Sequence, residues 1–335
     1  MSQRIIALDY VRVIAVFMIL LCHYFLFSDL NSGVGRYLAG SGNIVFFLVS
    51  AFLYGQKYNS VSQKNSDGSV NGGQVFDCQS FVFSRIAKLA ASVWPFLVVV
   101  ISLYIAMEIE FSWKDVGLNF LFLGYLGELP GNGHLWFLTI LILCYIEIIF
   151  FENFRLKRGY VPWFLLLLSI LVVVIGEKIG IPSGALLVFG LFAFIYLKSE
   201  WYREKSKAMQ WWMAIAIVVI NVVTFIIEYN GLFEKSRIIH FLLTGLCGLS
   251  LLSLMLRYLP NKKVRIVSFL SGISFEIYIV HHTLCSGPFV RITSWTCGHV
   301  LNFIIMFFLS VILAVVLNFI AKHVGSFVSG RILRH

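Results

Sequence analysis

Three ionisable side chains lie inside the first long apolar run of the chain. Asp9, Arg12 and His23 all fall within residues 5–27. At 100° per residue, Asp9 and Arg12 are one turn apart and Arg12 and His23 three turns, so a helix places all three on one face. A charge at mid-bilayer costs at least about 2.5 kcal/mol on insertion scales. If this run crosses a membrane, the shared face is predicted to meet protein or water.

These residue types suggest proton transfer and anion binding. A neutral imidazole has an ordinary pKa of about 6.5 and is a common general base for a hydroxyl group. Asp9 lies further from His23 than Arg12 does, so it is predicted to pair with Arg12 at i, i+3 and not to orient the imidazole. At a rise of about 1.5 Å per residue, Arg12 and His23 are about 16 Å apart along the axis. The alternative is a snorkelling Asp9–Arg12 pair beside a helix-capping histidine.

Two further apolar runs carry histidine near the same expected membrane depth. His134 begins residues 134–151, and His281 completes a polar stripe with Ser274 and Tyr278. An interfacial residue beside a tryptophan belt and an interhelical hydrogen-bond seam are the alternatives for these two positions. Three helices with histidine at one level favour a common cavity for His23, His134 and His281.

The elements that position these residues follow from composition. The 335 residues are 59% hydrophobic and 13% charged, with a mean hydropathy of +0.89, which excludes a water-soluble protein. Runs long enough for helices predict an all-α polytopic membrane protein of about ten transmembrane helices, at residues 5–27, 38–54, 89–107, 134–151, 162–175, 185–197, 209–227, 238–256, 266–284 and 301–320. Residues 116–126 are too few to cross and are predicted to be re-entrant or interfacial.

Charge sets the predicted orientation. With both termini cytoplasmic, 19 Lys and Arg fall on the inner side, against six outside, namely Arg36, Lys114, Lys178, Lys235, Arg237 and Arg291. The net charge of +10 is therefore attributed to the cytoplasmic loops, and no nucleic-acid partner is predicted. The chain is predicted to form a single domain over residues 1–335, with residues 59–79, rich in Ser, Asn and Gly, as a flexible cytoplasmic loop.

Four segments resemble the membrane-bound acyltransferase family 3, in the order in which that family has them. They are Leu8-Asp9-Tyr10-Val11-Arg12 with His23 eleven residues later, Phe46-Phe47-Leu48-Val49-Ser50-Ala51-Phe52-Leu53, His134-Leu135-Trp136-Phe137-Leu138, and Gly272-Ile273-Ser274-Phe275-Glu276-Ile277-Tyr278-Ile279-Val280-His281. The chain departs from the family pattern at Ala51, where glycine is usual. In the basic stretch before the third helix only Arg85 and Lys88 correspond, and Ala91 replaces a proline.

The resemblance implies transfer of an acyl group, usually acetyl from cytoplasmic acetyl-CoA, to a hydroxyl of a cell-envelope saccharide or lipid-linked glycan precursor. It implies a catalytic role for His23, Arg12 and Asp9, with His23 as general base or as the residue that is covalently acetylated. Arg85 and Lys88 are the predicted CoA-binding residues, because coenzyme A is polyanionic. The residues predicted to position the acceptor or the acyl group are Ser50, His134, Trp136, Tyr278 and His281.

Two other functions compete with this interpretation. A polytopic transporter or exporter would line its path with the polar face of the first helix, although the chain shows no inverted repeat. A non-catalytic partner of a glycan-assembly complex is the other. No metal is predicted, since the six cysteines have no zinc-ligand spacing. The predicted location is a bacterial cytoplasmic membrane, in contact with lipid, and the sequence does not define an oligomeric state.

Overall fold

The computed structural model describes residues 5–64, 76–154, 156, 159–179, 184–231 and 237–332. Of residues 59–64 and 325–332 it describes the backbone only. Within these residues the chain contains helices and turns and no strand, so the all-α fold is confirmed. Six basic residues used for the predicted orientation lie outside the described residues, namely Arg4, Arg155, Lys157, Arg158, Lys235 and Arg334, as do residues 65–75 of the predicted loop.

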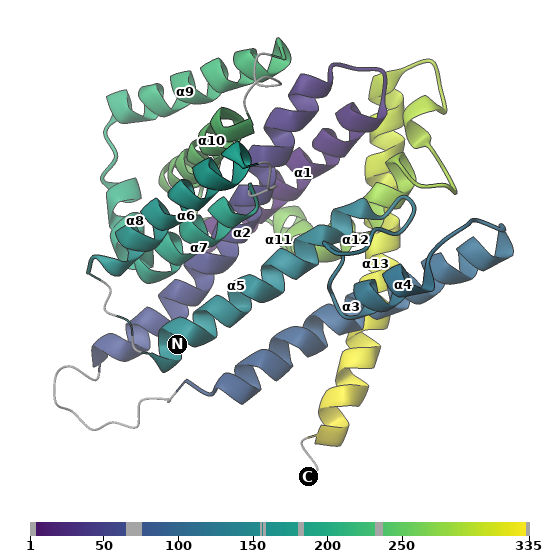
Figure 1. Ribbon diagram of the computed structural model, residues 1–335, viewed down its shortest axis with the longest axis horizontal. Coiled ribbons are helices and arrows are strands. Elements are labelled where there is room, and N and C mark those ends of the chain that lie inside the picture. The colour runs from purple at the N-terminus through teal and green to yellow at the C-terminus, as the bar shows by residue number, and fades with distance from the viewer. Residues whose placement is uncertain are drawn as a thin grey trace. The chain divides into compact units, whose positions relative to one another are not determined.

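The chain forms two compact units. Figure 1 labels the helices that make them up. The first unit comprises residues 1–26, 30–76 and 146–271. Its helices are α1 (Ala7–Phe27), α2 (Ser32–Lys64), α6 (Val161–Lys178), α7 (Leu186–Leu197), α8 (Ser199–Lys207), α9 (Trp211–Tyr229), α10 (Arg237–Tyr258) and α11 (Arg265–Gly272). Within this unit α2 packs against α7, α9 and α10, and α6 packs against α7.

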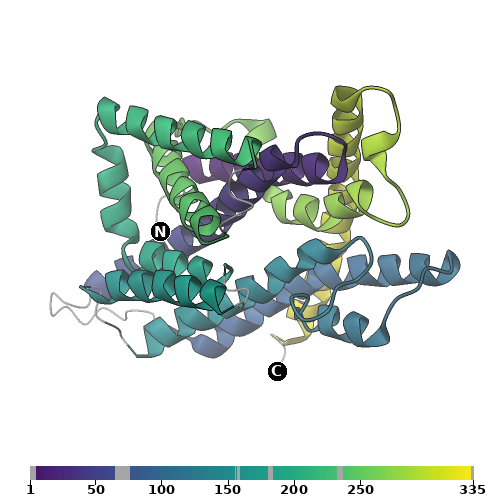
Figure 2. The ribbon, with the colours of Figure 1, turned by 45° about the horizontal axis from the view of Figure 1, so that its top comes forward.

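The second unit comprises residues 27–29, 77–145 and 272–335. Its elements are α3 (Cys78–Ala106), α4 (Trp113–Phe120), the 3-10 turn η1 (Gly133–Leu135), α12 (Ser274–Cys285), the 3-10 turn η3 (Ile292–Ser294) and α13 (His299–Ile332). Helix α13, yellow in Figure 2, packs along both α3 and α12. Helix α5 (Trp136–Asn153) is divided between the units after Tyr145.

Local chemistry explains where several helices begin. Asp77 accepts a hydrogen bond from the backbone N–H of Ser80 at 3.1 Å and so caps the start of α3. Pro162 lies in the first turn of α6, where its missing N–H has no helical partner to lose. Helix α3 continues through Ala91, where the family pattern has proline, and through Pro95 one turn later.

Among the described residues, eight helices are long and apolar enough to cross a bilayer, so the protein is a multi-pass integral membrane protein. Two of the ten predicted spans differ in form. Residues 185–197 form only the 12-residue α7, about 18 Å long, whose side chains are almost all buried. Residues 266–284 do not form one helix, because the chain breaks at Ile273 into α11 and α12. Apolar side chains are common to continuous and broken helices, so hydropathy does not distinguish them.

The segment predicted to be re-entrant or interfacial, residues 116–126, is helical only in its first part. Helix α4 ends at Phe120, and turns follow. The Asn119 side chain donates to the Asp115 carbonyl at 2.9 Å and to the Gly127 carbonyl at 2.8 Å. The second bond satisfies a carbonyl beyond the end of α4 and holds the segment after the helix against its last turn.

Candidate active site

The Asp9–Arg12 pair predicted from the sequence is present at the start of α1. Arg12 Nη1 lies 3.9 Å from Asp9 Oδ1, and the Ser271 hydroxyl of α11 donates to the same oxygen at 3.0 Å. The Asp9 side chain is 5% exposed, whereas that of Arg12 is 34% exposed. The carboxylate is therefore held inside the protein, and it offsets the charge of a guanidinium that keeps access to its surroundings.

The same helix end is tied to the segment that precedes α11. The backbone N–H of Ile6 donates to Asn261 Oδ1 at 3.1 Å, and the Tyr10 hydroxyl donates to the Lys262 carbonyl at 2.9 Å. With the Ser271 bond, these contacts fix the position and rotation of α1 within the first unit. They also fix the direction of the face that carries Asp9 and Arg12.

His23 lies near the other end of α1 and is half-buried. Its Nδ1 is 3.1 Å from the Ile19 carbonyl oxygen, one turn earlier. A carbonyl oxygen only accepts, so this bond requires the proton on Nδ1 and leaves the lone pair of the neutral ring on Nε2. The backbone of α1 thus selects the tautomer in which Nε2 is the basic nitrogen.

Glycine on α2 permits close packing beside this turn. A Cβ at Gly35 would lie 3.0 Å from the Cys22 carbonyl oxygen and 2.8 Å from Leu26 Cγ. Further along α2, Ser50 is half-buried, and its hydroxyl is 3.5 Å from the Phe46 carbonyl of its own helix. Ser50 and His23 both belong to the first unit, on consecutive helices.

The histidines of the second unit form a buried cluster. The His134 and His282 rings are stacked, with centroids 4.5 Å apart and planes inclined by 17°, and the His134 and His281 centroids are 5.4 Å apart. His281 is fully buried, and His134 is nearly so. The structure therefore brings together His134 and His281, two of the three histidines predicted to share a cavity. His23 belongs to the other unit, and its grouping with them remains a prediction.

Each ring of this cluster donates to a backbone carbonyl. His134 Nε2 is 2.9 Å from the Ile279 oxygen, and His281 Nδ1 is 2.7 Å from the Tyr278 oxygen. His282 Nδ1 is 2.8 Å from the carbonyl oxygen of Gly131. The His134 bond joins η1 to α12, the His282 bond joins α12 to the turn before η1, and the His281 bond lies within α12. Each bond fixes the tautomer of the neutral ring.

Gly131 supplies the acceptor for His282 because of its unusual backbone. Its φ is +68°, a left-handed conformation that glycine adopts without strain. A Cβ here would also lie 2.4 Å from Gly287 Cα. Any other residue at position 131 would strain the turn before η1.

Tyr278 and Trp136, two predicted positioning residues, differ in their surroundings. The buried Tyr278 hydroxyl donates to the His134 carbonyl at 2.7 Å, so it supports the cluster through the backbone. Its ring also lies against Phe137, with centroids 4.7 Å apart. Trp136 is half-buried at the start of α5.

The predicted CoA-binding residues lie near the start of α3. Arg85 is half-buried, with its guanidinium carbon 5.6 Å from the centre of the Phe81 ring, and Lys88 is exposed one turn later. Ser92, a further turn along, donates to the buried Glu276 carboxylate of α12 at 2.9 Å. Helix α3 therefore presents cations at one end and anchors the histidine-bearing helix with the next turn.

Two groups were not among the residues predicted from the sequence. The first is His282, whose contact with His134 depends on the tertiary packing of α12. The second is a buried carboxylate, Glu228 of α9, which pairs with Arg36 of α2, Nε to Oε2 at 3.5 Å, and with His240 Nδ1 of α10. One sequence signal could have found this cluster. Its acid and two bases all lie at the ends of predicted spans on the outer side of the membrane.

No group of three or more His, Cys, Asp or Glu side chains in the described part of the chain is arranged to hold a metal ion. Comparison with known protein families gives a match to the acyltransferase domain of membrane-bound acyltransferase family 3 over residues 5–322. The chain belongs to this family. The match confirms the resemblance in the four sequence segments. It shows that the protein is an integral membrane acyltransferase, an enzyme that moves an acyl group from a donor to an acceptor. No significant match was found among curated proteins or among solved structures.

Proposed function

We propose that this acyltransferase moves an acetyl group from cytoplasmic acetyl-CoA to a hydroxyl of a cell-envelope saccharide or lipid-linked glycan precursor, in a bacterial cytoplasmic membrane. The observation that carries the proposal is the state of His23. It is a half-exposed imidazole on an intramembrane helix, and its neutral form has the lone pair on Nε2. Hydroxyl acylation needs a base of this kind, because a sugar hydroxyl is a weak nucleophile at neutral pH.

In the proposed reaction, Nε2 removes the proton of the acceptor hydroxyl as its oxygen attacks the thioester carbonyl carbon. The C–O bond forms, the C–S bond breaks, and the CoA thiolate leaves and receives the proton from the imidazolium. In the covalent alternative, Nε2 attacks the thioester carbonyl carbon, the C–S bond breaks, and CoA leaves as the thiolate. The acceptor oxygen then attacks the acetyl group, the C–N bond breaks, and the hydroxyl proton passes to the thiolate. Both routes use the same nitrogen, and both give an ester and free CoA.

Arg12 and Asp9 are assigned to the donor. Arg12 is the more exposed partner of the pair and bears a permanent positive charge that suits a phosphate, while Asp9 orients it. Arg85 and Lys88 are assigned to the other CoA phosphates. Arg12 and His23 are about 16 Å apart along α1, a distance that an extended pantetheine arm would span.

The remaining residues are assigned to positioning of the acceptor or the acyl group. Ser50 is one of them, in the first unit. His134 and Trp136 enter from η1 and α5, and Tyr278 and His281 from α12. The buried members act through the backbone carbonyls that they hold, since their ring N–H and hydroxyl groups are bonded to carbonyls.

The test uses purified protein, acetyl-CoA labelled in the acetyl group, and a glycan and glycolipid extract of a strain that lacks the gene. The expected product is a labelled, hydroxylamine-sensitive ester on saccharide, formed with one equivalent of free CoA. A labelled longer-chain acyl-CoA is assayed in parallel, and preferential transfer from it would overturn the proposed donor. Label on protein-free lipid without sugar would overturn the proposed acceptor. Absence of any CoA-dependent transfer would overturn both assignments.

A further inference from the structure

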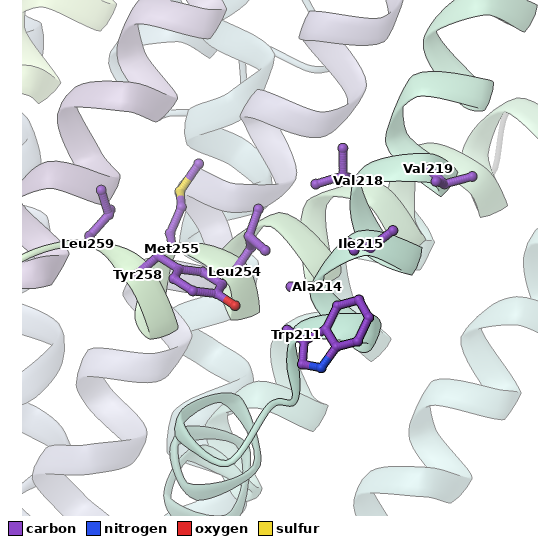
Figure 3. Close-up of a pocket in the computed structure, with 9 residues that line it drawn as sticks. All are labelled: Trp211, Ala214, Ile215, Val218, Val219, Leu254, Met255, Tyr258 and Leu259. Atoms are coloured by element: carbon purple, nitrogen blue, oxygen red, sulfur yellow. The ribbon is translucent and has the colours of Figure 1, made fainter.

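Helices α9 and α10 of the first unit leave an apolar groove at the end where α9 begins and α10 ends. Its volume is about 610 Å³. Figure 3 shows the side chains that line it, Trp211, Ala214, Ile215, Val218, Val219, Leu254, Met255, Tyr258 and Leu259. Ala214 is buried at the floor, whereas Trp211 and Val218 are exposed on the rim. The groove is open to the surroundings of α9 and α10, two helices that are long and apolar enough to cross a bilayer.

Cations gather at the end of this groove. Arg257 of α10 donates through Nη1 to the carbonyl of Lys207, the last residue of α8, and its guanidinium carbon lies 5.9 Å from the Tyr258 ring centre. Its guanidinium therefore bridges the segment before Trp211 and the end of α10. Lys207 and Arg257 are both exposed. Aromatic rings beside basic side chains at a helix end are typical of a membrane–water interface.

The lining of the groove and the charges beside it select among possible occupants. Every side chain that lines the groove is apolar or aromatic, which suits a hydrocarbon chain. The exposed cations Arg257 and Lys207 suit a negatively charged headgroup. A helix from a second copy of the chain is the alternative occupant.

We propose that this groove binds an anionic phospholipid of the surrounding leaflet, with an acyl chain between α9 and α10 and the phosphate against Arg257 and Lys207. The basic end supplies charge complementarity for the headgroup, and the apolar walls receive the chain. Basic pockets between membrane helices bind acidic lipid headgroups in this manner. Under the predicted orientation this lipid belongs to the cytoplasmic leaflet.

The test is native mass spectrometry of the full-length protein released from detergent, titrated with phosphatidylglycerol or with phosphatidylcholine of the same acyl chains. One phosphatidylglycerol is expected to bind at least five-fold more tightly than phosphatidylcholine, since one basic side chain near a membrane surface contributes about that factor. Lys207→Gln and Arg257→Gln are each expected to lower the affinity for phosphatidylglycerol about five-fold. Arg257→Lys keeps the charge and controls for the lost bond to the Lys207 carbonyl.

A groove-filling variant tests the acyl chain separately. Val218→Trp, on the exposed rim, is expected to weaken both lipids, and Val98→Trp, at a similarly exposed position on α3 of the second unit, is the matched control. Equal affinity for the two lipids, or unchanged binding in Lys207→Gln and Val218→Trp, would overturn the proposal. A dimer whose formation excludes the lipid would also overturn it. These readouts need no acyl transfer and are independent of the proposed function.

Discussion

His23 of the first unit and the buried histidine cluster of the second unit are held in different ways. In the first unit, His23 is half-buried, and Nε2 is its basic nitrogen. In the second unit, His134, His281 and His282 pack on one another in the interior and donate to carbonyls of α12 and of the turn before η1. An imidazole that is half-exposed retains access to a substrate, whereas a buried one bonded to a carbonyl mainly fixes the backbone. Histidine in a membrane helix therefore does not by itself indicate a base.

The charges differ between the units in a similar way. In the first unit, two buried carboxylates pair with arginines, Asp9 with Arg12 and Glu228 with Arg36. Near the start of α3 in the second unit, Arg85 lies over the Phe81 ring, and Lys88 is exposed. A cation paired with a buried carboxylate is held in a fixed geometry, and an exposed side chain such as Lys88 can reach an anionic ligand. The following predictions would break or sharpen this comparison.

The largest effect on stability is expected at Asp9. Asp9→Ala removes the carboxylate beside the partly exposed Arg12 and the acceptor of the buried Ser271 hydroxyl, so unfolding should become about 2 to 3 kcal/mol easier. Thermal unfolding in detergent, followed by tryptophan fluorescence, measures this loss. The double variant Asp9→Ala/Arg12→Met removes the uncompensated charge and should recover part of it. Additive effects of the two substitutions would show that the pair is not coupled.

Gly131→Ala is expected to destabilise the protein by about 2 kcal/mol, because alanine is strained at a φ of +68° and its Cβ meets Gly287. The matched control is Gly117→Ala in α4 of the same unit, where a Cβ meets no atom within 4 Å. That change should be neutral or slightly stabilising, since alanine favours helix. The same unfolding assay compares the two variants. Equal stability would contradict the role assigned to the turn before η1.

His282→Phe keeps a ring against His134 but removes the bond to the Gly131 carbonyl. The expected loss of stability is about 1 kcal/mol, the usual net value of one hydrogen bond. Transfer activity per folded molecule should change by less than about ten-fold, below the range for loss of a general base. A loss of 100-fold or more at unchanged stability would make this ring part of the chemistry.

The smallest effect is expected at Lys88. Lys88→Gln should raise the KM for acetyl-CoA about three-fold, with kcat unchanged, because an exposed charge contributes well under 1 kcal/mol to an ion pair. Lys178→Gln, at an exposed position on α6, is the control and should leave KM unchanged. A lower kcat with constant KM in Lys88→Gln would contradict a role in donor binding.

Periodicity and hydropathy predicted the features that depend on a single helix. The Asp9–Arg12 pair was predictable because its partners are one turn apart on α1. The division of residues 266–284 into α11 and α12 was not, since Gly272 and Ile273 are compatible with either a continuous or a broken helix. The stack of His134 on His282 and the Arg36–Glu228–His240 cluster were missed for a different reason. Each joins segments far apart in sequence, and hydropathy carries no information on which helix ends meet.

The most direct test of the central claim compares two histidines with the same local bond. His323 of α13 is exposed and bonds through Nδ1 to the Phe319 carbonyl at 2.8 Å, as His23 does to Ile19. Transfer of labelled acetyl from acetyl-CoA to saccharide is measured for His23→Ala and His323→Ala at equal amounts of folded protein. We predict a 10²- to 10⁴-fold loss for His23→Ala and none for His323→Ala. Transfer by His23→Ala above a tenth of the unmodified rate would contradict the account.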